Sequence, residues 1–169
     1  MSYRNKTYVA FASEDIHQYR MMEAWRDNKH IDFDFFDAHD LYVSRDTSRP
    51  ETIKRNLRDR MKNAKQIVLL GTAAASKKGS NGTSFLAREV DLAIEFNLPV
   101  VVANTDGDRT IDRSFIPRPF LSADYYTLSV SFQPAIIRFA LDNYVPGFHK
   151  GGKTGPHYYK ARVYRDLGL

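Results

Sequence analysis

The sequence has 169 residues, 43% of them hydrophobic, which is enough to bury one core but short for two domains. The absence of cysteine excludes a disulfide framework, a thiolate metal site and a cysteine nucleophile. Most of the net charge of +5 lies in residues 145–169, which carry +4, so the rest of the chain is nearly neutral and nucleic acid is not an expected partner.

Five short apolar runs predict β-strands. In chain order they are residues 7–11, 33–36, 66–70, 99–103 and 125–128. The first, third and fourth runs are nearly unbroken and rich in β-branched residues, which is typical of strands covered on both faces of a parallel sheet. The second and fifth runs are shorter and more mixed, as expected of edge strands.

The segments between these runs have helical spacing. Apolar residues recur every three or four positions within residues 16–22, 53–64, 86–94 and 136–144. Asp15, Pro50 and Ser131 stand where three of these helices would begin. The pattern predicts helices that alternate with the strands, and it leaves residues 112–121 without an assignment.

Alternating strands and helices require right-handed crossovers, so we expect an α/β fold. It would be flavodoxin-like, with a doubly wound sheet of five parallel strands in the order 2-1-3-4-5. In that order a ligand crevice opens at the carboxyl ends of the first and third strands. The loops at residues 12–15, 37–49 and 71–84 are therefore the expected location of a site.

Residues 145–169 are interpreted as a basic tail entered through glycine and proline. We expect the last helix to end, and the core to be complete, at Tyr144, so that the α/β domain spans residues 1–144 and the tail adds a strand or forms a flexible arm. Residues 147–154 read GFHKGGKT and match the phosphate-binding-loop pattern, but a helix precedes them where that loop needs a strand. We therefore assign them to the tail.

The sequence lacks the residues that other functions of this type of fold require. The third strand ends in Leu70-Gly71-Thr72, without the phosphoacceptor aspartate of a response regulator. The acidic loop Ala12-Ser13-Glu14-Asp15 would repel the phosphate of a flavin, and no G-x-G-x-x-G motif follows a strand. The five histidines show no metal-ligand spacing, so no metal site is expected.

Several short motifs occur in the order and spacing of a known family. They are Tyr8-Val9-Ala10-Phe11 with Asp15, Phe36-Asp37-Ala38-His39-Asp40, a helix starting near Pro50, and Phe85-Leu86-Ala87-Arg88-Glu89. With these motifs the chain resembles, over nearly all of residues 7–144, the bacterial TIR-like domains related to the Thoeris antiphage sensors. Members of that family bind or cleave NAD.

The resemblance implies roles for particular residues. Glu89 takes the position of the catalytic glutamate that acts on the ribose of NAD, and Phe85 that of an aromatic residue four positions earlier, where many members have tryptophan. The loops after the first and second strands would form walls of the NAD pocket. The residues that the resemblance implies for NAD binding are Phe11, Ala12, Ser13, Asp37, His39, Arg45, Phe85 and Asn104.

The helical position of Glu89 favours such a role independently. Residues i and i+4 share a helix face, so Phe85 and Glu89 lie on one side, beside the buried stripe that begins at Leu86. One carboxylate suffices to split nicotinamide from ribose, because the leaving group carries a positive charge and departs neutral. The alternative is a solvated glutamate that pairs with Arg88 or Lys78. Because Glu89→Gln keeps the size and the helix propensity of the side chain, we expect it to remove NAD cleavage while changing stability by no more than about 0.5 kcal/mol.

The leading hypothesis is a cytoplasmic NAD-consuming enzyme that cleaves the nicotinamide–ribose bond and gives ADP-ribose, a cyclic ADP-ribose or a conjugated signal in antiphage defence. NAD is then a substrate, and no cofactor is expected. The expected partners are further copies of the chain, through self-association, and an effector protein reached through the nucleotide signal. Two alternatives stay open: a non-catalytic signalling or assembly module, and a nucleoside deoxyribosyltransferase-like enzyme.

The N-terminus and the apolar runs favour the cytoplasm. Residues 1–7 are polar and contain no signal-peptide core. No stretch of the sequence approaches the roughly 20 apolar residues that a membrane helix requires. We therefore expect neither secretion nor a membrane partner.

Overall fold

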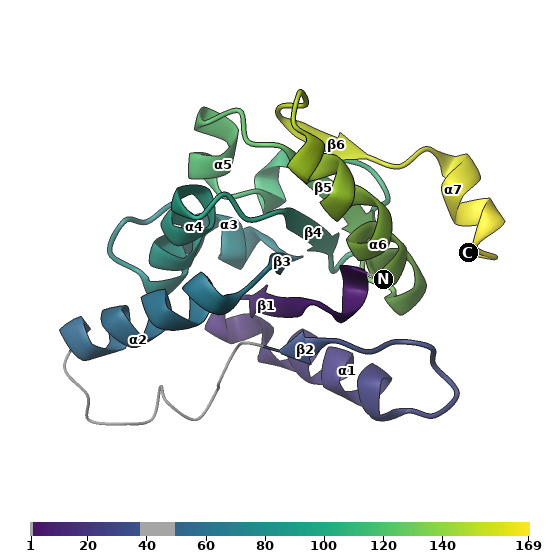
Figure 1. Ribbon diagram of the computed structural model, residues 1–169, viewed down its shortest axis with the longest axis horizontal. Coiled ribbons are helices and arrows are strands. Elements are labelled where there is room, and N and C mark those ends of the chain that lie inside the picture. Colours follow the sequence, from purple (N-terminus) through teal and green to yellow (C-terminus); the bar gives the residue numbers. More distant parts are fainter. Residues whose placement is uncertain (1, 38–49) are drawn as a thin grey trace.

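The computed structural model describes residues 2–37 and 50–169. The strands in this part are β1 (Lys6–Ala10), β2 (Phe36–Asp37), β3 (Gln66–Gly71), β4 (Val100–Asn104), β5 (Thr127–Ser131) and β6 (Pro156–Tyr158). They form one sheet with only parallel pairings, in the order β2-β1-β3-β4-β5-β6 (Figure 1). The predicted α/β fold and the order 2-1-3-4-5 are confirmed, and a sixth strand extends the sheet beyond β5.

Helices cover both faces of the sheet. One face carries the 3-10 helix η1 (Ser2–Arg4) and the helices α1 (Ile16–Asp27), α6 (Pro134–Lys150) and α7 (Ala161–Asp166). The opposite face carries α2 (Pro50–Asn63), α3 (Ala73–Gly79), α4 (Phe85–Glu95) and α5 (Arg118–Ser122) (Figure 1). Every residue of β3 and β4 is buried between these layers, which explains their continuous apolar sequence.

Alternate side chains of each strand enter opposite cores. Val9 and Val68 pack with α1 and α6, whereas Tyr8 and Leu69 pack with α2 and α4. The register places Val9 beside Val68 and Tyr8 beside Ile67, so neighbouring strands send matching residues to the same face. This alternation decides which side chains of β1 can reach α4.

Three short helices were missed by the apolar spacing. The loop after β3 contains α3, whose N-cap is Thr72: its Oγ1 accepts a hydrogen bond from the Ala75 amide at 3.0 Å. The unassigned segment contains the 3-10 helix η4 (Arg113–Phe115) and α5. Helices of this length show too few turns for a periodic pattern to be visible in the sequence.

The expected end of the last helix at Tyr144 is wrong, because α6 continues to Lys150 with Pro146 inside it. Val145 and Phe148 extend the buried face of the helix into this last part, and their packing outweighs the lost backbone hydrogen bond at the proline. Gly151 ends the helix with a φ of 74°, a left-handed conformation that favours glycine. The helix therefore crosses the boundary predicted between residues 144 and 145.

The C-terminal residues also complete the core, contrary to the expectation that it ends at Tyr144. β6 pairs with β5, and α7 places Tyr164 in the core with a fully buried side chain. The amide of Ser131 donates a hydrogen bond to the Tyr164 hydroxyl at 3.0 Å, and the Arg109 guanidinium lies 4.5 Å from the centre of its ring. Of the two expectations for this segment, an added strand is confirmed.

Candidate functional site

Glu89 lies on the buried face of α4. Ser84 caps the start of this helix, because its Oγ accepts a hydrogen bond from the Ala87 amide at 2.9 Å. From that start, Leu86, Glu89, Val90 and Ala93 turn toward the sheet, and Glu89 is only 7% exposed. The carboxyl group therefore lies inside the buried layer between α4 and the sheet. The sequence predicted a position beside the buried stripe of the helix, not within it.

The Glu89 carboxyl has one hydrogen-bond partner in the described part of the chain. The hydroxyl of Tyr8, itself 1% exposed in β1, donates to Oε1 of Glu89 at 2.7 Å. Burial raises the pKa of Glu89 to about 7, and the hydrogen bond from Tyr8 opposes this rise because it stabilises the carboxylate. Near neutral pH the group is thus divided between its protonated and its ionised forms.

The solvated ion pair considered for Glu89 is not found among the described residues. Lys78 instead contacts the first loop: its Nζ lies 2.8 Å from Oε1 of Glu14 and 2.9 Å from Oγ of Ser13. Arg88 makes no ion pair with Glu89. No cation from the described part of the chain therefore offsets the cost of ionising the buried carboxyl.

Phe85 opens α4 on the same side as Glu89 and is 50% exposed. In a right-handed β-α-β unit the helix starts near the carboxyl edge of the sheet, so the first turn of α4 lies at that edge. Few large apolar side chains of the described residues are as exposed as Phe85; Met21 and Tyr158 are the others. The helix thus carries an exposed aromatic ring one turn before a buried carboxyl.

The carboxyl ends of β1 and β3 are tied together by a buried polar contact that sequence analysis missed. Thr72 Oγ1 donates to Oδ2 of Asp15 at 2.6 Å, and Asp15 is 8% exposed. Ala12 is buried beside it, while Ser13 is exposed and bonded to Lys78. These contacts hold the 3-10 helix η2 (Ser13–Asp15) against the start of α3, at the predicted crevice.

Two of the predicted NAD-binding residues make other contacts in the described part of the chain. The ring of Phe11 stacks on Tyr19 at 4.8 Å between ring centres, on the face of α1 and α6. Asn104 is fully buried at the end of β4, where its Nδ2 donates to the carbonyls of Asp108 and Thr110 at 3.1 and 3.0 Å. In this structure Asn104 organises the loop that follows β4.

The loop after β2 contributes the remaining predicted residues. His39 and Arg45 lie outside the described residues. Asp37 is the last residue of β2, and only its backbone is described. Besides Phe11 and Asn104, the predicted site residues with described side chains are thus Glu89 and Phe85 on α4, and Ala12 and Ser13 on the loop after β1.

Two hollows on the surface of the described residues lie elsewhere. One, of about 670 Å³, is lined by residues that include Asn5, Lys65 and Leu98, at the amino ends of β1, β3 and β4. The other, of about 410 Å³, lies between Ile31 and Arg138. Neither hollow is lined by Glu89.

The described residues contain no group of three or more potential metal ligands. None of the helices in the described residues is long and apolar enough to cross a membrane.

Comparison with known families gives one match that covers most of this architecture. The model described as "Thoeris protein ThsB, TIR-like domain" matches residues 8–110, which run from Tyr8 in β1 past the end of β4. The matched segment therefore includes both Tyr8 and Glu89. No curated protein matches the chain.

Proposed function

The chain belongs to the TIR-like domain family of the Thoeris protein ThsB, and from this premise we propose that it cleaves NAD between nicotinamide and ribose with Glu89 as the catalytic carboxylate. The observation that carries the proposal is the buried contact between Glu89 and Tyr8, one helical turn behind the exposed ring of Phe85. A titratable group that burial shifts strongly is typical of active sites.

The chemistry requires only one carboxylate. The nicotinamide ring of NAD is positively charged and leaves as a neutral molecule, so the reaction needs no general acid, unlike ordinary glycoside hydrolysis with its two carboxyl groups. As the bond breaks, positive charge develops on the ribose. A fixed carboxylate in a partly dry site stabilises that charge more strongly than water does.

The divided protonation of Glu89 suits a cationic substrate. In the free protein the carboxyl at about pH 7 is half ionised, because burial raises its pKa. A nicotinamide cation beside the group favours the carboxylate and lowers that pKa. Substrate binding would therefore convert the remaining protonated molecules into the reactive form and release a proton.

The proposed cellular role follows the family. Released ADP-ribose, its cyclic form or a conjugate of it would act as a nucleotide signal in antiphage defence, read by an effector protein. Self-association of the chain would assemble the active form, and the reaction would take place in the cytoplasm. No cofactor is required, since NAD itself is the substrate.

Glu89→Gln tests this proposal. The amide keeps the size of the side chain and can still accept the hydrogen bond from Tyr8, but it removes the charge. We expect nicotinamide release to fall by on the order of a hundredfold, the loss that follows removal of one preorganised electrostatic contact. The assay measures nicotinamide by chromatography, with purified self-associated protein and with cells during phage infection.

Asp91→Asn is the matched control, because Asp91 lies on the same helix and is exposed. It should retain the parental rate. A Glu89→Gln protein that cleaves NAD as fast as the parent would exclude Glu89 as the catalytic group. Free base released from deoxynucleosides, but not from NAD, would instead assign the site to a deoxyribosyltransferase-like reaction.

One observation favours a second function, a non-catalytic assembly module. A carboxyl that is 7% exposed and bonded to a buried tyrosine also fits a polar pair within a core. In that case neither the parent nor Glu89→Gln cleaves NAD under any of these conditions, while self-association persists in both proteins.

A further inference from the structure

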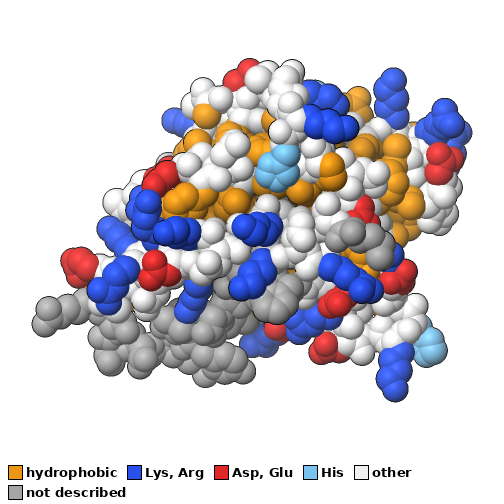
Figure 2. All heavy atoms as spheres, in the orientation of Figure 1, with side chains coloured by type: hydrophobic (Ala, Val, Ile, Leu, Met, Phe, Trp, Pro, Cys, Tyr) orange, Lys and Arg blue, Asp and Glu red, His pale blue; other side chains and the backbone are white. Residues whose placement is uncertain are grey.

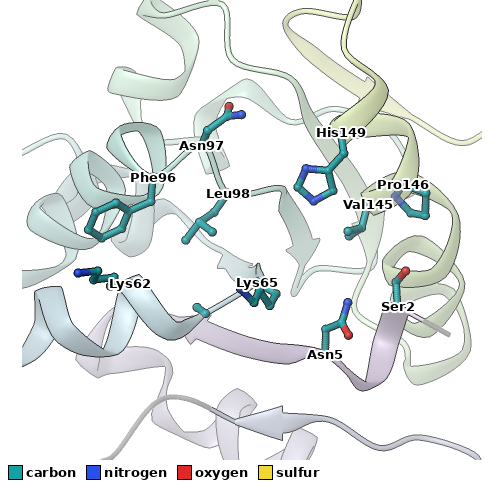
Figure 3. Close-up of a pocket in the computed structure, with 11 residues that line it drawn as sticks. Ser2, Asn5, Lys62, Lys65, Phe96, Asn97, Leu98, Val145, Pro146 and His149 are labelled. Carbon is teal, nitrogen blue, oxygen red and sulfur yellow. The ribbon is translucent and has the colours of Figure 1, made fainter.

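The hollow of about 670 Å³ lies at the amino edge of the sheet, opposite to the edge at which Phe85 opens α4. Its floor is formed by the buried side chains of Ala64, Leu98 and Val145. Figure 3 shows Phe96 on one wall, His149 projecting from α6 on the other, and Lys65 between them. Its volume falls within the range of about 300 to 1,000 Å³ that is usual for small-molecule sites.

The rim of this hollow is basic and contains no carboxylate. Lys62, Lys65 and His149 line it together with neutral polar residues, and all three are exposed. None of the three has an ion pair with a carboxylate of the described residues. On the face seen in Figure 2, apolar side chains lie near the middle with Lys and Arg side chains close by, and acidic side chains lie mainly toward the margins.

The aromatic wall is held in place by its neighbours. The Arg58 guanidinium lies 5.0 Å from the centre of the Phe96 ring. Arg58 is itself fixed by two contacts with Glu95, at 2.6 and 3.0 Å. The carboxylate of Glu95, which precedes Phe96 in the chain, is thus engaged by Arg58, and Arg58 in turn contacts the Phe96 ring.

Helix ends explain part of this charge pattern. Lys62 and His149 lie in the last turns of α2 and α6, where the helix dipole favours cations. Lys65 lies beyond the end of α2, in the link to β3, so the dipole of α2 does not account for it. A cationic rim, an apolar floor and a fixed ring together fit a ligand that carries both phosphate and an aromatic base.

We propose that this hollow binds a nucleoside diphosphate, with the phosphates at Lys62 and Lys65 and the base against Phe96. Lysine is a common phosphate ligand, and aromatic rings stack on nucleobases. The apolar side chains of the hollow and the ring of Phe96 favour a ligand with an aromatic base over an acidic protein segment, which would use the same cations. The inference does not depend on Glu89 or on NAD cleavage.

Binding is tested by amide NMR of the full chain, titrated separately with ADP, adenosine and inorganic pyrophosphate. ADP should shift the amide signals of Lys65, Asn97 and His149 and bind more tightly than either fragment. Removing two exposed charge contacts in Lys62→Gln/Lys65→Gln should weaken ADP about tenfold. Phe96→Leu should weaken ADP but leave pyrophosphate unchanged, because only the stacking ring is lost.

Lys54→Gln/Lys160→Gln is the matched control, since it removes the same charge from exposed positions outside the hollow. It should leave ADP affinity nearly unchanged. Three results would overturn the proposal: no ADP binding, equal weakening in both double variants, or shifts confined to residues near Phe85 and Glu89. Binding of polyglutamate without binding of ADP would also overturn it and would assign the hollow to an acidic protein partner.

Discussion

Glu89 couples the proposed chemistry to the stability of the fold. Its carboxyl is 7% exposed, and the Tyr8 hydroxyl is its hydrogen-bond partner within residues 2–37 and 50–169. Burying a charge is costly unless it is paired, so the folded protein retains the proton more strongly than the unfolded chain does. Residue 89 could be identified from the sequence through its motif, but the depth of its burial could not, because that depends on β1 packing against α4.

This linkage predicts a pH-dependent effect of Glu89→Gln on stability. The folded-state pKa of about 7 lies above the ordinary value of 4.5, so the contribution of Glu89 is present below about pH 4.5 and is lost as the pH rises through 7. The loss amounts to about 3 kcal/mol. Glutamine does not ionise, so the Glu89→Gln variant does not lose this stability as the pH rises. The variant should match the parent near pH 4 and exceed it by up to about 3 kcal/mol near pH 8.

Urea unfolding at the two pH values measures this difference, with Asp91→Asn as a control that should follow the parent. The sequence alone predicts a change of no more than about 0.5 kcal/mol for this substitution, whereas the burial of the carboxyl predicts a larger and pH-dependent change. Parental and Glu89→Gln stabilities that run parallel between the two pH values would show that the carboxyl is not buried in solution.

Tyr8→Phe isolates the hydrogen bond from the charge. Without the hydroxyl, the bond that lowers the pKa of Glu89 is gone, so that pKa should rise further above 7. In a pH profile of nicotinamide release, the ascending limb on the acidic side, which reports the ionisation of Glu89, should then move to higher pH. Carboxyl-carbon NMR measures the same shift without requiring activity. An unchanged titration of Glu89 in Tyr8→Phe would contradict the role of Tyr8.

At the scale of elements, the sequence predicts the strands and helices in which buried residues recur at regular spacing. β1, β3 and β4 are visible as apolar runs because both of their faces are covered, and α4 is visible through its buried stripe. α3 was missed because a single polar residue, Thr72, defines its start, and the contact of Thr72 with Asp15 joins positions far apart in the chain. Such contacts leave no periodic signal.

Thr72→Val should therefore destabilise the carboxyl edge of the sheet. It keeps the shape of the side chain but removes the cap of α3 and leaves the buried Asp15 without its hydroxyl donor. We expect a loss of about 2 kcal/mol in urea unfolding, from the cap and the hydrogen bond together. Thr72→Ser keeps the hydroxyl and should stay close to the parent; equal losses in the two variants would point to packing as the cause.

At the scale of the whole molecule, the sequence left the place of the C-terminal segment open between an added strand and a flexible arm. Its glycines, prolines and basic residues are typical of a tail. The segment nevertheless contains the strand β6 and the buried ring of Tyr164. Gly155 illustrates the reason: it has a φ of 71°, its amide donates to the Asp124 carbonyl, and a Cβ there would lie 2.9 Å from Oδ1 of Asp124. The glycine is required by a long-range turn into β6, whereas in the sequence it resembles a linker.

Deleting residues 151–169 should consequently destabilise the domain. The deletion removes β6 from the sheet, uncovers β5 and withdraws Tyr164 from the core that α6 shares with β4 and β5. Loss of one buried aromatic side chain alone costs about 3 to 5 kcal/mol, a large part of the stability of a typical domain. We expect the truncated protein to lose its cooperative thermal transition, or to melt far below the parent.

Tyr164→Ala should reproduce most of the loss. Tyr164→Phe keeps the ring and removes only the hydroxyl that accepts a hydrogen bond from the Ser131 amide, so it should cost about 1 kcal/mol. A truncated protein that melts like the parent would mean that the segment is a dispensable arm, as its composition suggests.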